Sequence, residues 1–210
     1  MSVSPGVTLS PDREALVELS AALAARDAAR LETALRTAAA ETDAEAVEET
    51  ILQSYLFLGY PVALNALGLW RTVSGCEAAE PAEDREEWEE RGARVCQAVY
   101  GGQYEGLRAN IGRLHRDMER WMVEEGYGKV LGRPGLDLPT RELCIAAILM
   151  VQDVPRQLYS HLRGALNVGA SAAEVERALE IAVPWCTADV ANRARETWAS
   201  VRARTSPRSS

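Results

Sequence analysis

The chain has 210 residues, of which 47% are hydrophobic and 26% are charged, and it carries a formal net charge of −8. The length allows one large domain or two small ones, and the composition is typical of globular proteins rather than disordered ones. The negative charge argues against nucleic acid as a partner, because binding to a phosphate backbone depends on Lys and Arg.

Three features of the sequence predict a cytoplasmic protein. The four cysteines form no C-x-x-C pair and no zinc-type spacing. The N-terminus lacks the basic start and apolar run of a signal peptide. The longest apolar stretch, 143–151, is too short to span a bilayer. We therefore expect reduced thiols and no membrane partner.

Helix signals run along almost the whole chain, whereas strand signals are weak. Ala, Leu, Glu and Arg are frequent, and β-branched runs are few. Ser10-Pro11 places a cap residue before a proline at the first helical position, which predicts a helix start. We therefore predict an all-α fold.

Two capping boxes predict further helix starts. Thr42 with Glu45 fits the pattern S/T-x-x-E, and so does Ser171 with Glu174. In this pattern the hydroxyl and the carboxylate each accept a hydrogen bond from a free backbone N–H at the helix start.

Three segments predict interruptions between helices. Residues 72–90 are acidic and contain Gly and Pro, so we expect an exposed connector that leads into a helix. Residues 133–135 (Arg-Pro-Gly) and 168–170 (Val-Gly-Ala) are helix breakers.

An internal repeat becomes visible when the chain is shifted by 127 positions. Leu16 then falls on Leu143 and Leu35 on Leu162, and the apolar periodicity stays in phase over roughly 60 residues. Helical segments rich in Ala and Leu inflate such matches, but the ungapped agreement favours a fused duplication.

The two copies differ at positions that could carry chemistry. The first copy has Ala15 where the second has Glu142, and Ala34 where the second has His161. Conversely, the Leu-Gly-Tyr-Pro turn at 58–61 has no counterpart in the second copy. The ionisable groups are therefore expected in the second copy.

Glu142 and His161 are the strongest candidates for catalytic residues. We expect their two helices to form an antiparallel hairpin joined near Asp153, which brings the two side chains together. A carboxylate beside an imidazole orients the ring, and such a pair can transfer protons near neutral pH. The alternative is a buried histidine that is hydrogen bonded for structural reasons.

Four further residues are candidates for substrate binding. Arg141 and Arg163 could hold an anionic group, because guanidinium matches carboxylate geometry, or they could be surface arginines. Tyr60 and Trp185 could line a pocket or pack in the core. The second histidine, His115, has charged neighbours and is expected to be exposed. With two histidines and no acids clustered around them, no metal site is expected.

Residues 126–183 carry a family resemblance. The run GYGKVLGRPGLDLPTRELCIAAILM, followed by QLYSHLRGALNVGASAAEVERALEIAV, resembles the core of carboxymuconolactone decarboxylases and the related alkylhydroperoxidase D-like proteins. On this resemblance, 88–198 is a nearly complete repeat, 9–71 is a degenerate first repeat, and 72–87 is an acidic linker.

The resemblance implies an all-helical fold and a function. The fold would be the alkylhydroperoxidase D-like helical fold, and the function that of a cofactor-free lyase acting on a small carboxylated lactone or related compound. His161 would donate a proton, Glu142 would orient it, and Arg141 or Arg163 would hold an anion. Family members usually assemble as trimers or hexamers, so a homo-oligomer is expected, with a trimer of duplicated chains favoured.

Two other functions remain open at this stage. The peroxidase branch of the family carries two cysteines before its histidine, and the corresponding positions here are Val154 and Gln157, so Cys144 would have to act alone. The chain could also be a non-catalytic binding or assembly module left by a decayed duplication. If it is an enzyme, Tyr60 or Asn65 of the first copy could complete the site of the second.

Overall fold

The computed structural model describes residues 9–77 and 87–205, and every regular element within them is helical. The predicted all-α fold is therefore confirmed. Residues 1–8, for which no signal peptide was expected, and most of the predicted linker, 78–86, lie outside the described residues. Among the helices described, none is long and apolar enough to cross a membrane.

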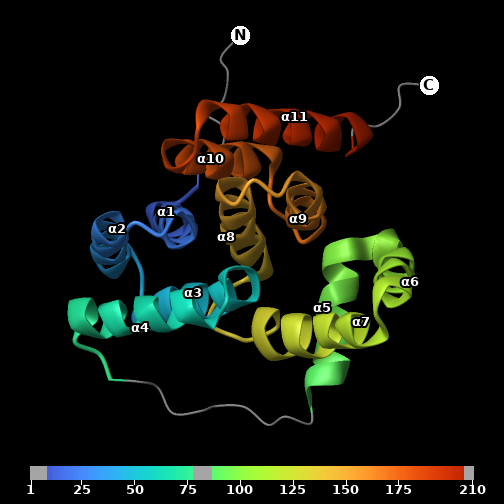
Figure 1. The fold of residues 1–210 in the computed structure, drawn as a ribbon, viewed down its shortest axis with the longest axis horizontal. Helices are drawn as coiled ribbons and strands as arrows, with labels where there is room; N and C mark the ends of the chain where they lie inside the picture. The colour runs from blue at the N-terminus through green and yellow to red at the C-terminus, as the bar shows by residue number, and fades with distance from the viewer. Residues whose placement is uncertain (1–8, 78–86, 206–210) are drawn as a thin grey trace.

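The helices fall into three groups along the chain (Figure 1). The first unit consists of α1 (Pro11–Ala25), α2 (Ala28–Glu41), α3 (Ala44–Leu58) and α4 (Tyr60–Ser74). The middle group consists of α5 (Trp88–Tyr100), η2 (Gly101–Gln103), α6 (Tyr104–Leu114), α7 (Arg116–Trp121) and the π-helical η3 (Met122–Leu131). The second unit consists of α8 (Leu138–Val151), α9 (Pro155–Asn167), α10 (Ala172–Ala182), η4 (Val183–Trp185) and α11 (Ala188–Thr205).

The centre of the fold is the contact between α1 and α8. Residues 140–150 of α8 are all buried, because α1, α3, α9, α10 and α11 surround this helix. A helix that is covered on all sides has no polar face, which explains the apolar run at 143–151. Figure 1 shows α10 and α11 on one side of this centre, α3 and α4 on the other, and the middle group beside them.

Helix starts follow the local signals with one exception. Ser10 is the N-cap of α1, with proline in the first turn, and Ser171 and Glu174 form the predicted capping box of α10. The capping box predicted at Thr42 is wrong. Asp43 caps α3 by accepting from the N–H of Ala46, because aspartate is an even better N-cap acceptor than threonine.

The two units share their helix boundaries at the 127-residue shift. The starts of α1 and α2, Pro11 and Ala28, correspond to the starts of α8 and α9, Leu138 and Pro155, and the starts of α3 and α4 agree with those of α10 and α11 within one residue. The turn residues Arg26 and Asp153 are also 127 apart, and both are left-handed, with φ of 58° and 57°. These agreements support the internal repeat; its origin by duplication stays a prediction.

Candidate active site

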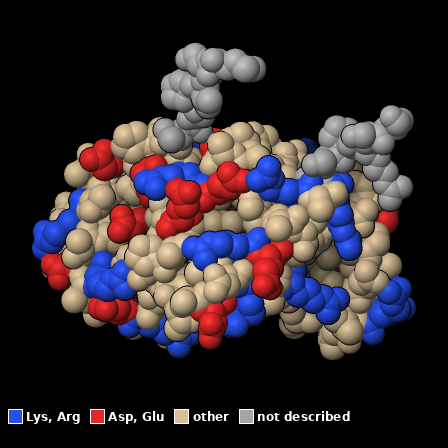
Figure 2. Space-filling view, turned by 90° about the horizontal axis from the view of Figure 1, so that it is seen from above, with Lys and Arg blue, Asp and Glu red and all other residues tan. Residues whose placement is uncertain are grey.

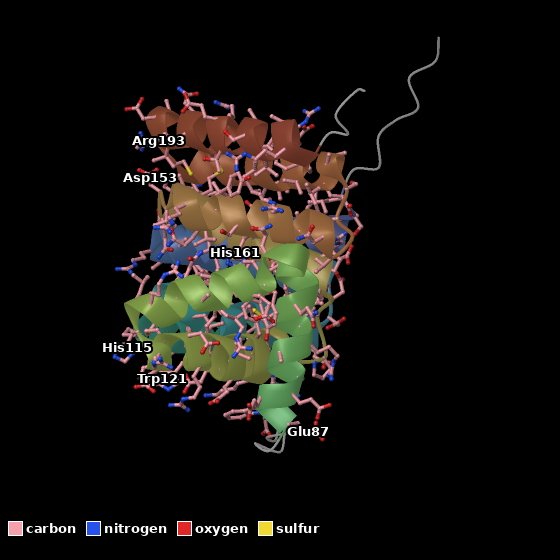
Figure 3. The ribbon with its side chains drawn as sticks, turned by 90° about the vertical axis from the view of Figure 1, so that its right-hand side faces the viewer. Glu87, His115, Trp121, Asp153, His161 and Arg193 are labelled. Atoms are coloured by element: carbon pink, nitrogen blue, oxygen red, sulfur yellow. The ribbon has the colours of Figure 1, made fainter. Side chains whose placement is uncertain are left out.

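Glu142 and His161 meet in the second unit. Nδ1 of His161 lies 2.8 Å from Oε2 of Glu142, which is a hydrogen bond between α9 and α8. Both groups are buried, with 2% of Glu142 and 7% of His161 exposed. In Figure 3, His161 lies near the middle of the molecule, whereas His115 lies at its edge. The αα-hairpin therefore brings the two residues together as the sequence indicated.

A glycine makes room for the Glu142 carboxylate. A Cβ atom at Gly164, one turn after His161 on α9, would lie 2.7 Å from Oε2 of Glu142 and 2.7 Å from Cγ1 of Val99. Both distances are shorter than real Cβ contacts. Gly164 is therefore required so that α5, α8 and α9 can close around the pair.

The first unit contributes one side of the site. Phe57 of α3 contacts the His161 ring in an edge-to-face arrangement, with the ring centroids 5.7 Å apart. Its backbone carbonyl accepts a hydrogen bond from Nε2 of Gln152, which follows α8. We expected Tyr60 or Asn65 in this role. The signal that could have identified Phe57 is that it is the only Phe of the chain.

Tyr60 itself points to the surface. Its side chain is 58% exposed and its ring stacks on Tyr55, with the centroids 4.8 Å apart. The structure therefore does not bring Tyr60 to His161.

The buried Tyr127, the half-buried Tyr100 and the buried thiol of Cys96 lie on the α5 side of the pair. The Tyr127 hydroxyl donates to the Tyr100 hydroxyl at 3.0 Å. Burial raises the pKa of both tyrosines, and the nearby charge of Glu142 raises them further. Burial also raises the pKa of Cys96 to about 12. These groups therefore stay neutral at physiological pH, so they add no charge beside Glu142.

The guanidinium of Arg141, the residue before Glu142, forms its hydrogen bonds with other groups of the protein. It is fully buried and donates to Oε2 of Glu49 at 2.7 Å and to Oε1 of Gln53 at 3.4 Å. It also donates to the carbonyls of three residues that precede α8, Arg133, Pro134 and Leu136. Burial lowers the pKa of Arg141, and the hydrogen bond with Glu49 opposes this. The contacts favour a structural role over anion binding, because few donors remain for a ligand.

Comparison with known proteins gives a match to one family model and matches to two individual proteins. A model of the carboxymuconolactone decarboxylase family matches residues 116–199. Peroxisomal protein 2 of Schizosaccharomyces pombe is 30% identical over 142 residues, which cover 65% of this chain and 67% of the relative. Nitrosuccinic acid decarboxylase of Metarhizium robertsii is 31% identical over 98 residues, which cover 46% of this chain and 68% of the relative.

The chain belongs to the carboxymuconolactone decarboxylase family. The matching segment extends from α7 into α11 and contains Glu142, His161 and Gly164. The first unit, which supplies Phe57, precedes this segment. The His161–Glu142 pair therefore lies within the segment that matches the family model, whereas the residue that contacts His161 from the first unit lies outside it.

The other two residues that the sequence suggested for substrate binding, Arg163 and Trp185, do not face His161. Arg163 is half-buried on α9, and within the described residues it has no hydrogen bond or ion pair. It follows His161 by two positions, so its side chain leaves the helix on a different face. Trp185 packs under the guanidinium of Arg30 from α2, 3.5 Å from the ring centroid, and not against His161.

Cysteine chemistry has little support in this family member. Cys144 is buried, and burial raises its pKa to about 11. At neutral pH such a thiol is almost entirely protonated, and the thiolate is the reactive form. The positions where the peroxidase branch has cysteines, Val154 and Gln157, cannot supply a partner thiol.

Proposed function

We propose that this chain is a cofactor-free decarboxylase in which His161 donates a proton and Glu142 orients it. The observation that carries the proposal is the buried 2.8 Å hydrogen bond between His161 and Glu142. The carboxylate accepts from Nδ1, which leaves Nε2 as the ring nitrogen that can meet a substrate. Membership of the family and the relative named a nitrosuccinic acid decarboxylase support this reaction type.

The chemistry defines a class of substrate. When a carboxylate leaves as CO₂, the electron pair of the broken C–C bond stays on the remaining carbon. A conjugated carbonyl, as in an unsaturated lactone, or a nitro group can accept that pair. A protonated His161 would then give its Nε2 proton to the carbon, and the carboxylate of Glu142 would face the positive charge of the protonated ring. Solvent restores the proton in the next cycle.

Of the two candidate arginines, we carry forward Arg163 as the group that meets the substrate carboxylate. Its guanidinium has no acceptor within residues 9–77 and 87–205, whereas Arg141 is committed to Glu49. Because Arg163 is not on the His161 face of α9, it would act at the rim of the site. Replacing Arg163 with Gln should then raise KM more than it lowers kcat.

The test measures CO₂ release from a panel of unsaturated lactone carboxylates and α-nitro acids, followed by NMR in D₂O. We expect one deuterium at the carbon that lost CO₂. His161→Ala should lower kcat by at least about a hundredfold, the low end for removal of a general acid. His115→Ala is the matched control, because His115 is exposed and caps α7. Full turnover by His161→Ala would overturn the assignment.

A second candidate is a non-catalytic binding or assembly module. The observation that favours it is the enclosure of His161, which is only 7% exposed and covered by Phe57. Two cavities of about 210 Å³ and 410 Å³ among the described residues are lined by other side chains than Glu142 and His161. Absence of turnover with the whole panel, together with unchanged ligand binding in His161→Ala, would favour this candidate.

Homo-oligomerisation is part of the proposal. Leu114, Met118 and Trp121 form an exposed apolar group on α6 and α7. Such groups often mark contacts between proteins. Light scattering should give three times the monomer mass for the favoured trimer, and replacing Trp121 and Met118 with Ser should lower it.

A further inference from the structure

Lys129 is the only lysine of the chain, which uses arginine at all its other basic side chains. It lies half-buried on η3, with its ammonium 5.4 Å from the ring centroid of Trp88 and 5.8 Å from that of Tyr55. No carboxylate among the residues described forms an ion pair with it. This cation is therefore held by aromatic rings alone, which is a weak arrangement without a counter-ion.

Two hydrogen-bond donors in the same cluster also lack acceptors. The Tyr55 hydroxyl and the Trp88 indole N–H are buried, and neither has a partner within the described chain. Burial, and then the neighbouring Tyr60 hydroxyl and the charge of Glu125, raise the pKa of Tyr55 to about 12, so its hydroxyl stays protonated; the Tyr60 hydroxyl is near but not in hydrogen-bonding geometry, so the Tyr55 proton remains available to another acceptor. Buried polar groups without a partner are costly, and they often mark a place where a water or ion belongs.

The surroundings describe the ligand that would complete the cluster. The Tyr60 ring stacks on Tyr55 and is more than half exposed, so it offers a flat apolar surface beside the donors. The nearest acid on the same element, Glu125, is exposed and forms no ion pair with Lys129 within the described part of the chain. A positive charge, two neutral donors and a flat ring suit an anionic group attached to an unsaturated body.

We propose that Lys129, Tyr55 and Trp88 bind the carboxylate of a small, flat organic acid whose body lies against Tyr60. The site is formed where the C-terminal end of α3 lies beside η3 (Figure 1). It is distinct from the His161 site, because Tyr55 and Phe57 are two positions apart on α3 and leave the helix on different faces. The proposal does not depend on the decarboxylase assignment.

The first test is calorimetric titration of the full chain with benzoate, with benzamide as the uncharged counterpart. We expect benzoate to bind and benzamide to bind at least about tenfold more weakly. Lys129→Met keeps most of the apolar stem and removes the charge, so it should weaken benzoate by about tenfold or more. Tyr55→Phe and Trp88→Phe each remove one donor and should weaken benzoate by about threefold to tenfold.

The controls separate this site from the His161 site. His161→Ala should leave benzoate affinity unchanged. If His161→Ala abolishes binding while Lys129→Met does not, benzoate occupies the other site and the proposal is overturned. Equal affinity of wild type and Lys129→Met, or no binding of benzoate at all, also overturns it. Circular dichroism of each variant checks that the fold is intact.

The single lysine permits an independent measurement. An amine-specific acylating reagent modifies only Lys129 and the N-terminal amine, and peptide mass spectrometry separates the two. Saturating benzoate should slow acylation of Lys129 at least about threefold and leave the N-terminal amine unchanged. Equal rates with and without benzoate would contradict the proposal.

Discussion

The first and second units have matching helix starts but opposite roles at the candidate site. The first unit places Ala15 and Ala34 where the second has Glu142 and His161, and both alanines are buried. It contributes Phe57 to the His161 ring instead. Two units with matching helix starts can therefore differ in role: the second holds the ionisable pair, and the first covers it.

The same comparison extends to the ion pairs that tie the units together. Arg141 of α8 forms an ion pair with Glu49 of α3. The residue of the first unit that corresponds to Arg141 is Glu14 of α1, and it forms an ion pair with Arg177 of α10. The charge at this position is reversed between the units, although the partners are not equivalent, because Glu49 corresponds to Glu176 and not to Arg177. The first pair is buried, whereas the side chains of the second are 30% and 38% exposed. The two links should therefore contribute very different amounts to stability.

The largest effect is expected when the buried link is broken. Arg141→Ala removes the fully buried partner of Glu49 and leaves it with the partly exposed Arg133 alone, so it should lower the free energy of unfolding by about 3 kcal/mol, the low end for a broken buried pair. Arg177→Ala should cost about 0–1 kcal/mol, because water replaces the lost partner. Urea unfolding followed by circular dichroism measures both, and similar losses would show that the two links are equivalent.

Adding one methyl group should disturb the site in the second unit only. Gly164→Ala would force the Glu142 carboxylate or Val99 to move, so we expect a loss of about 1–3 kcal/mol despite the better helix propensity of alanine. Thr37 occupies the same position in the first unit and is exposed, so Thr37→Ala should change stability by less than about 0.5 kcal/mol. A stable Gly164→Ala variant with full activity would argue against the close approach.

Thiol labelling should divide the cysteines by burial. Cys76 is exposed and should react with an aromatic disulfide reagent in the native protein. Cys96 and Cys144 should react only after unfolding, because burial blocks access and raises their pKa to about 12 and about 11. Rapid reaction of Cys144 in the folded chain would revive the peroxidase alternative.

The smallest effect concerns acid stability. Arg71, and to a lesser extent Trp70, lowers the pKa of Glu48 below its ordinary value of 4.5. Glu48 therefore stabilises the fold above about pH 4.5, and this contribution is lost as the pH falls through the lowered pKa. Glu48→Gln should remove about 0.5–1 kcal/mol near pH 7 and less near pH 3. Glu176 makes similar contacts with Trp198 and Arg202 but is more exposed, so Glu176→Gln should cost less.

The contact between Glu142 and His161 could be predicted from the sequence, because the two residues are close in the chain. Glu142 and His161 lie on consecutive helices joined by a short turn, and a hairpin of that kind has few possible arrangements. The catalytic role assigned to them stays a prediction. Arg163 and Arg141 could not be separated in advance, since a single sequence does not show that Glu49, 92 positions away, takes up Arg141.

The all-α fold, the helix starts at Ser10 and Ser171 and the register of the two units followed from the sequence alone, because apolar periodicity and capping act over a few residues. Three contacts emerged only from the packing of the helices: Phe57 covers His161, Trp185 packs under Arg30, and Lys129 lies against two aromatic rings with no carboxylate among the described residues paired to it. These contacts join residues far apart in the chain, and their formation depends on how whole helices pack rather than on any local pattern.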